Sequence, residues 1–148
     1  MSKDTADAKA ARPRFPKRDD EGRIELLTEY LAFVLASLFI GMVMLVAIDG
    51  VLALIHVNAF GSSSGWIGAV LAVFVFIDDF RAWKPGWTRW AVAGVAAVVS
   101  LAFGFVITSL MPPEWYQLFT GALGATIGCL LYTVLWFYGV RLLKAGRS

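Results

Sequence analysis

The chain has 148 residues, of which 59% are hydrophobic and 16% are charged. Soluble domains average roughly 45–50% apolar and about 25% charged residues, so this composition excludes a single small water-soluble core and indicates a lipid bilayer as the solvent. The net charge of +2 does not indicate nucleic-acid binding, because the cations follow a pattern of membrane orientation instead.

The composition of residues 1–22 predicts a disordered cytoplasmic tail. They are rich in Ala, Asp, Lys and Arg, they carry no periodic apolar face, and Pro13 and Pro16 interrupt any helix. We expect a transmembrane domain over residues 23–143 and a second cytoplasmic tail over residues 144–148.

The cations are segregated along the chain. All 13 Lys and Arg residues lie before Tyr30, between Arg81 and Arg89, or after Val140. Because cytoplasmic loops of membrane proteins carry an excess of Lys and Arg, this segregation predicts four spans with both termini in the cytoplasm. The predicted location is therefore the cytoplasmic (inner) membrane.

The first span is predicted over residues 30–57 and contains a polar stripe. Its length at about 1.5 Å per residue is roughly 42 Å, longer than the ~30 Å hydrocarbon core, so it must tilt, kink or protrude. Asp49 and His56 are seven residues apart and lie on nearly the same face of this predicted helix. Together with Glu114 they form a possible polar or ion site at the outer side of the membrane.

Two interpretations of this stripe are open. A carboxylate and an imidazole on one face can serve a proton relay, an ion site or a polar ligand pocket. Alternatively, Asp49 lies roughly 29 Å into the span, where the outer headgroups can hydrate it without any functional role.

The second span is predicted over residues 62–80 and ends in a charged cluster. Its strongly apolar part is short for a full crossing, so the positions of the cations are its main support. Asp78 and Asp79 oppose the helix macrodipole at its C-terminal end and need compensating partners. The available cations are Arg81, Lys84 and Arg89, and Arg141 at the end of the fourth span is a further candidate. An ion-pair cluster is predicted here, with a docking surface for another protein as the alternative.

The same stretch, from Arg81 to Trp90, is rich in Trp and in cations. Indole rings prefer the headgroup boundary, and cations prefer phosphate, so the stretch suits anionic lipid headgroups. General anchoring in the bilayer accounts for the same residues without a specific lipid.

The third and fourth spans are predicted over residues 90–110 and 115–140, as a tight antiparallel hairpin around Pro112 and Pro113. Small residues in the fourth span recur at three- and four-residue spacings and predict a helix-packing face. These residues are Gly121, Gly124, Ala125 and Gly128. Packing within the chain and packing on an oligomer or partner are both compatible with this face.

No motif for catalysis, nucleotide binding or metal binding stands out. We therefore expect no enzyme activity, no cofactor and no metal site, and Cys129 is interpreted as a small packing residue. The predicted fold is all-α, an integral membrane four-helix bundle with both termini cytoplasmic. Its predicted role is an accessory or interaction subunit that contacts the bilayer and a membrane-protein partner or a second copy. The alternative is a small oligomeric transporter or channel that uses the polar stripe of the first span.

Overall fold

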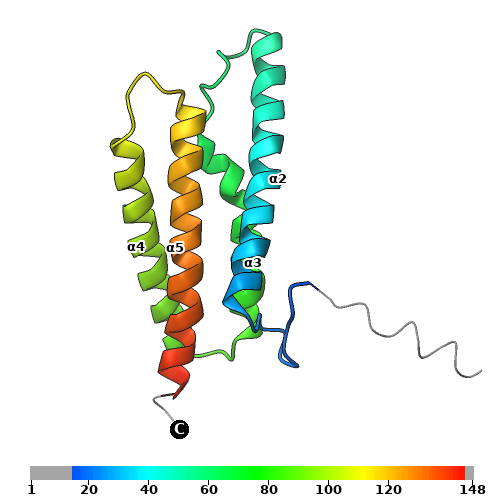
Figure 1. Ribbon diagram of the computed structural model, residues 1–148, viewed down its shortest axis with the longest axis vertical. Coiled ribbons are helices and arrows are strands. Elements are labelled where there is room, and N and C mark those ends of the chain that lie inside the picture. Colours follow the sequence, from blue (N-terminus) through cyan, green and yellow to red (C-terminus); the bar gives the residue numbers. More distant parts are fainter. Residues whose placement is uncertain (1–14, 146–148) are drawn as a thin grey trace, which may run out of the picture.

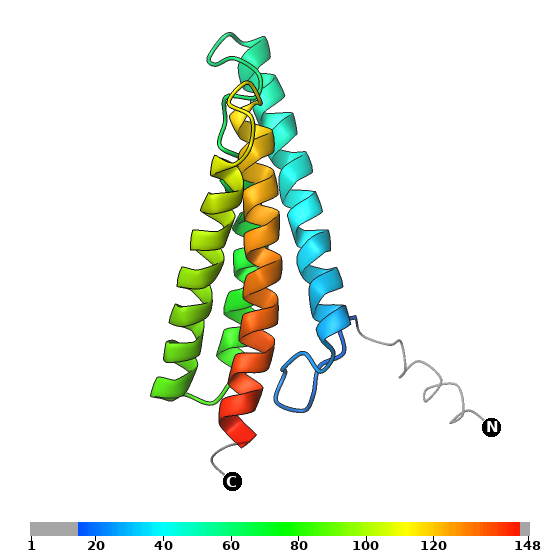
Figure 2. The same ribbon diagram turned by 60° about the vertical axis from the view of Figure 1, so that its left-hand side comes forward.

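The computed structural model describes residues 15–145, and its elements run up and down the long axis of a helical bundle (Figure 1). The elements are α2 (Leu27–Leu54), a 3-10 helix η1 (Gly65–Ala69), α3 (Val70–Ala82), α4 (Trp87–Ser109) and α5 (Gln117–Ala145). The segment that precedes α2 and the end of α5 lie at the same end of the bundle (Figure 2). The prediction of an all-helical fold is confirmed.

Three of the helices, α2, α4 and α5, are long and apolar enough to cross a membrane. Large apolar side chains cover their outer faces, among them Phe39 with an exposed fraction of 71% and Val98 with 69%. Soluble monomers rarely expose contiguous apolar surface on this scale. The helices therefore indicate a small membrane protein whose outer surface contacts lipid.

The second predicted span is made of two pieces. The five residues of η1 rise about 2.0 Å each and the 13 residues of α3 about 1.5 Å each, which together give roughly 30 Å. This summed length reaches the thickness of a hydrocarbon core of about 30 Å only if the two pieces are collinear. The helix α3 alone is too short to cross, and η1 lies obliquely to it in Figure 1.

Glycines allow η1 to pack backbone to backbone between α2 and α5. A Cβ atom at Gly41 of α2 would overlap the carbonyl oxygen of Gly68. A Cβ atom at Gly65 would overlap the backbone of Leu118 and Ala122 in α5. Only a residue without a side chain fits at these two crossings, so the position of η1 depends on them.

The most extensive packing in the bundle joins α4 to α5, as expected for the predicted hairpin. The four small residues of the predicted packing face all lie in α5 and make their contacts within the chain. A Cβ atom at Gly124 would lie 2.8 Å from the Gly104 carbonyl oxygen, and one at Gly128 would lie 3.2 Å from that of Ser100. The side chain of Trp66 lies along the same face, and Ala125 is fully buried.

Residues 17–25, here called the N-terminal hairpin, form a tight turn at the bundle end. An antiparallel bridge joins Arg18 to Ile24, and the Asp19 carboxylate accepts the backbone N–H of Arg23 at 2.9 Å and its guanidinium Nε at 2.7 Å. Desolvation opposes ionisation of Asp19, but the bonds from Arg23 outweigh it and hold the pKa of the Asp19 carboxyl below its usual value.

The N-terminal hairpin corrects part of the predicted tail. The sequence analysis placed residues 1–22 in a disordered segment, whereas residues 17–22 belong to the hairpin. The physical reason is Ile24, which has an exposed fraction of 1% and anchors the turn in the core. Residues 1–14 and 146–148 of the two predicted tails lie outside the described residues.

Candidate functional site

Asp49 is fully buried near the C-terminal end of α2, where it holds the following loop. Its Oδ2 accepts the backbone N–H of Gly61 at 2.6 Å, and its Oδ1 accepts that of Ser63 and the Asn58 side-chain amide, both at 3.2 Å. A carboxylate at a helix C-terminus faces an unfavourable dipole, and these three donors compensate for it.

Gly61 connects this carboxylate to the start of α5. Its carbonyl oxygen accepts the N–H of Leu118 at 3.2 Å, which satisfies one of the free donors in the first turn of α5. Its φ of +83° favours glycine, and a Cβ atom here would lie 2.6 Å from the Tyr116 ring. Asp49 therefore joins α2, the loop and α5 through one residue.

His56 does not share a helix face with Asp49, which corrects the predicted stripe. The helix α2 ends at Leu54, and His56 adopts a left-handed conformation with φ of +58°. Its N–H donates to the Ala53 carbonyl at 3.1 Å, and that of Val57 donates to the Leu52 carbonyl at 2.9 Å. These two bonds form a Schellman motif, in which the left-handed residue is usually glycine.

Replacing His56 by glycine is expected to stabilise the protein by about 0.5–1 kcal/mol, because glycine adopts the left-handed conformation without the Cβ clash. The change can be measured by titration with a denaturing detergent in mixed micelles. Its matched control is Ile55→Gly, because Ile55 has an ordinary φ of −89°. A stabilisation by Ile55→Gly of equal size would contradict this account of the helix end.

The three residues of the predicted outer site are not brought together. His56 and Glu114 are exposed in different loops, whereas Asp49 is buried under its own loop. Within residues 15–145, no group of three carboxylate, imidazole or thiol side chains is placed to hold a metal ion.

At the other end of the bundle, Asp79 of α3 is a second buried carboxylate, with an exposed fraction of 3%. Its Oδ1 accepts the backbone N–H of Ile24 at 3.2 Å, and its Oδ2 accepts the indole N–H of Trp136 at 2.7 Å. Asp79 therefore joins α3 both to α5 and to the N-terminal hairpin.

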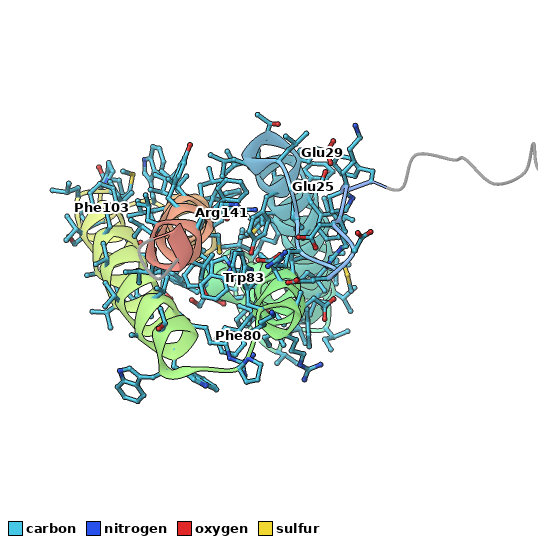
Figure 3. All side chains as sticks on the ribbon, turned by 90° about the horizontal axis from the view of Figure 1, so that it is seen from below. Glu25, Glu29, Phe80, Trp83, Phe103 and Arg141 are labelled. Atoms are coloured by element: carbon cyan, nitrogen blue, oxygen red, sulfur yellow. The ribbon has the colours of Figure 1, made fainter. Side chains whose placement is uncertain are left out.

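Arg141 binds the carbonyl group of Ile24, whose N–H is bound by Asp79. Its guanidinium donates to the Ile24 carbonyl oxygen at 2.6 Å and to that of Phe137 at 2.9 Å. The guanidinium also lies 3.4 Å from the centre of the Phe137 ring and 5.7 Å from that of Trp83. Seen from below, Trp83 lies between α5 and α3, and Arg141 lies beside α5 (Figure 3). A negative and a positive side chain thus clamp the two backbone polar groups of Ile24.

The predicted ion-pair cluster around Asp78 and Asp79 is not formed. No salt bridge joins these acids to Arg81, Lys84 or Arg89, all of which belong to the described part of the chain. Neighbouring residues of a helix point in directions about 100° apart, so only Asp79 faces the bundle while Asp78 is exposed.

The guanidinium of Arg89 does not pair with Asp78 or Asp79 as predicted. It donates to the Trp83 carbonyl oxygen at 2.9 Å and lies 4.5 Å from the centre of the Phe80 ring. Arg81 and Lys84 are exposed. The Arg81 and Lys84 side chains therefore stay available to groups outside the protein at this end of the bundle.

Three residues near Asp79 were missing from the predicted sites: Ile24, Tyr30 and Trp136. Arg141 was predicted as a partner of Asp78 and Asp79 but contacts the Ile24 carbonyl oxygen instead. Trp136 carries the clearest signal, since it lies inside the fourth predicted span whereas the other Trp residues lie mostly at span ends. A buried indole N–H needs an acceptor, and a carboxylate is the strongest one available. The fully buried Tyr30 hydroxyl has no hydrogen-bond partner within residues 15–145, and no sequence pattern predicts its position.

Comparison of the chain with protein-family models, with curated proteins and with solved structures finds no match.

The buried carboxylates at the two ends of the bundle, Asp49 and Asp79, have similar roles. Each buried carboxylate accepts hydrogen bonds from donors that belong to the fold, and each fixes a polar segment to the end of an apolar bundle.

Proposed function

We propose that this protein is an accessory or interaction subunit of a membrane complex, without enzyme activity of its own. The observation that carries the proposal is the clamp on Ile24, in which Asp79 and Arg141 fix the N-terminal hairpin to the bundle. Ionisable side chains in the apolar part of a membrane protein are costly, so their partners indicate what they are kept for. Here they position a polar segment at the end of the bundle.

The N-terminal hairpin has the properties of an interaction surface. Ile24 is buried, whereas the charged side chains of Asp20, Glu21 and Glu25 are exposed on the turn. A rigid surface loses little conformational entropy on binding, which favours association with another chain. The hairpin also lies where a partner at the membrane surface can reach it.

The orientation belongs to the same proposal: four crossings, with both chain ends on the cytoplasmic side of the inner membrane. The described cations from Arg81 to Arg89 follow α3 at the bundle end that also holds the N-terminal hairpin and Arg141, which supports this orientation. A reporter active only outside the cytoplasm is expected to give signal when fused after Ser64 and none when fused after Leu143. The reverse pattern would contradict the orientation.

The transporter alternative depends on a polar stripe of Asp49 and His56 along one helix, but α2 ends before His56. Asp49 uses both carboxylate oxygens to hold the loop after α2, and His56 and Glu114 lie outside the bundle. We do not propose this alternative further.

The test of an accessory role is purification of the tagged full chain in mild detergent, followed by mass spectrometry of the intact complex. We expect one or more other chains at constant stoichiometry. The double variant Asp20→Lys with Glu25→Lys reverses two exposed charges of the N-terminal hairpin and is expected to lose the partner.

The matched control is Glu114→Lys, which reverses an exposed charge at the opposite end of the bundle and should keep the partner. Recovery of the wild-type chain only as a monodisperse homo-oligomer would overturn the accessory role. Retention of the partner by the double variant would remove the N-terminal hairpin from the interface.

A further inference from the structure

A lateral groove opens between α3 and α4. The helix α3 packs on α2 while α4 packs on α5, and no extensive contact joins α3 to α4 in the described bundle. The groove has a volume of about 670 Å³ and is lined by apolar side chains such as Val73 and Ile77 of α3. Small residues, Ala93 and Ala97 of α4, keep it deep. Its volume is within the range of about 300–1,000 Å³ that is typical of ligand sites.

The length of the groove matches one leaflet of a bilayer. It extends along α4 from Arg89 to Leu101, and the 12 rises of about 1.5 Å between these two residues cover roughly 18 Å. One leaflet contributes about half of the ~30 Å hydrocarbon core, or roughly 15 Å. An extended acyl chain therefore fits along the groove with its polar end beside Arg89.

That polar end of the groove is cationic. Arg81 and Arg89 line it, and neither forms a salt bridge with any carboxylate in the described part of the chain. Arg89 also lines a smaller adjoining cavity of about 230 Å³ together with Lys84. Phe80 and Trp90 meet there with ring centres 4.7 Å apart, and Phe80 lies at this end in the view from below (Figure 3).

We infer that the lateral groove binds an anionic phospholipid of the bilayer, with an acyl chain between α3 and α4 and the phosphate on Arg81 and Arg89. Guanidinium groups bind phosphate oxygens through paired charge-assisted hydrogen bonds, and the groove supplies two guanidinium groups that form no salt bridge within residues 15–145. The apolar walls exclude water from the acyl chain. This site is independent of the N-terminal hairpin and of the accessory role.

The test is native mass spectrometry of the full chain after incubation with equal amounts of phosphatidylglycerol and phosphatidylcholine that carry the same acyl chains. We expect retention of phosphatidylglycerol over phosphatidylcholine by roughly 10- to 30-fold, since each cation near a lipid surface favours an anion by about fivefold. Arg81→Gln with Arg89→Gln should remove this preference, whereas Lys84→Gln should keep most of it.

Ala97→Phe fills the groove and should abolish retention of both lipids. The matched control is Val98→Phe, because Val98 is 69% exposed and does not line the groove. An independent measurement uses phosphatidylglycerol with brominated acyl chains, which should quench the tryptophan fluorescence of the wild-type chain more strongly than that of Ala97→Phe, because Trp66 and Trp90 line the groove.

Equal retention of the two lipids by the wild-type chain would overturn the inference. Unchanged retention by Ala97→Phe, or equal quenching of the wild-type chain and Ala97→Phe by the brominated lipid, would do the same. Loss of a bound protein or of a dimer in Ala97→Phe, with no change in lipid, would assign the groove to a transmembrane helix instead.

Discussion

Replacing Asp79 by asparagine will destabilise the protein by about 1.5–3 kcal/mol, the range for losing a hydrogen bond to a charged group. The carboxylate accepts both the Ile24 N–H and the Trp136 indole N–H. An amide has only one oxygen, so one of these donors will face the new NH₂ group. The free energy of unfolding can be measured by titration with a denaturing detergent in mixed micelles.

The same change should release the N-terminal hairpin from the bundle. Amide hydrogen exchange within residues 17–25 is expected to accelerate on the order of 30-fold, because about 2 kcal/mol corresponds to that factor. Exchange in the middle of α4 should not change. This local measurement separates undocking of the hairpin from general loss of the fold.

The matched control is Asp78→Asn, which removes the same charge from the neighbouring exposed residue. Exposed substitutions usually change stability by less than about 0.5 kcal/mol, and the N-terminal hairpin should stay protected. Equal effects of the two substitutions would show that charge alone matters at this end, which would contradict the clamp on Ile24.

Replacing Gly41 by alanine is the second large expected effect. The new methyl group would overlap the carbonyl oxygen of Gly68, which belongs to the backbone of η1 and cannot rotate away. Overpacking of this kind costs about 1–3 kcal/mol, and the effect here should lie at the upper end because two backbones must separate. Unfolding in mixed micelles and near-ultraviolet circular dichroism of Trp66 report the change.

Gly50→Ala provides the control within the same helix. No atom lies within 4 Å of a Cβ atom placed at Gly50, so the substitution adds a methyl group in open space. Alanine favours helix over glycine by about 1 kcal/mol, and stability should therefore stay equal or rise. If both alanine substitutions have the same effect, the close approach of α2 to η1 is not the reason for Gly41.

The positions of the long helices could be predicted from the sequence because apolar runs and their charged ends are local properties. The predicted third span, residues 90–110, differs by only a few residues from α4, Trp87–Ser109. The first helix was predicted to end at residue 57 but ends at Leu54, since a left-handed residue that is not glycine gives no sequence signal.

The candidate sites were predicted less completely. Asp49 could be selected as a polar group in a span, but its partners come from a loop whose path depends on Gly61 and on the start of α5. Asp78 and Asp79 are equivalent as sequence letters, and only the rotation of α3 about its axis gives one of them a buried role.

Composition and the placement of cations were sufficient to predict an all-helical membrane protein, because the transfer of side chains between water and lipid is nearly independent of their neighbours. The clamp of Asp79 and Arg141 on Ile24 joins residues 55 and 117 positions apart in the chain. The lateral groove likewise exists because α3 packs on α2 while α4 packs on α5. Such features depend on how the helices are rotated and paired. Glycine contacts and buried hydrogen bonds between distant segments determine this rotation and pairing.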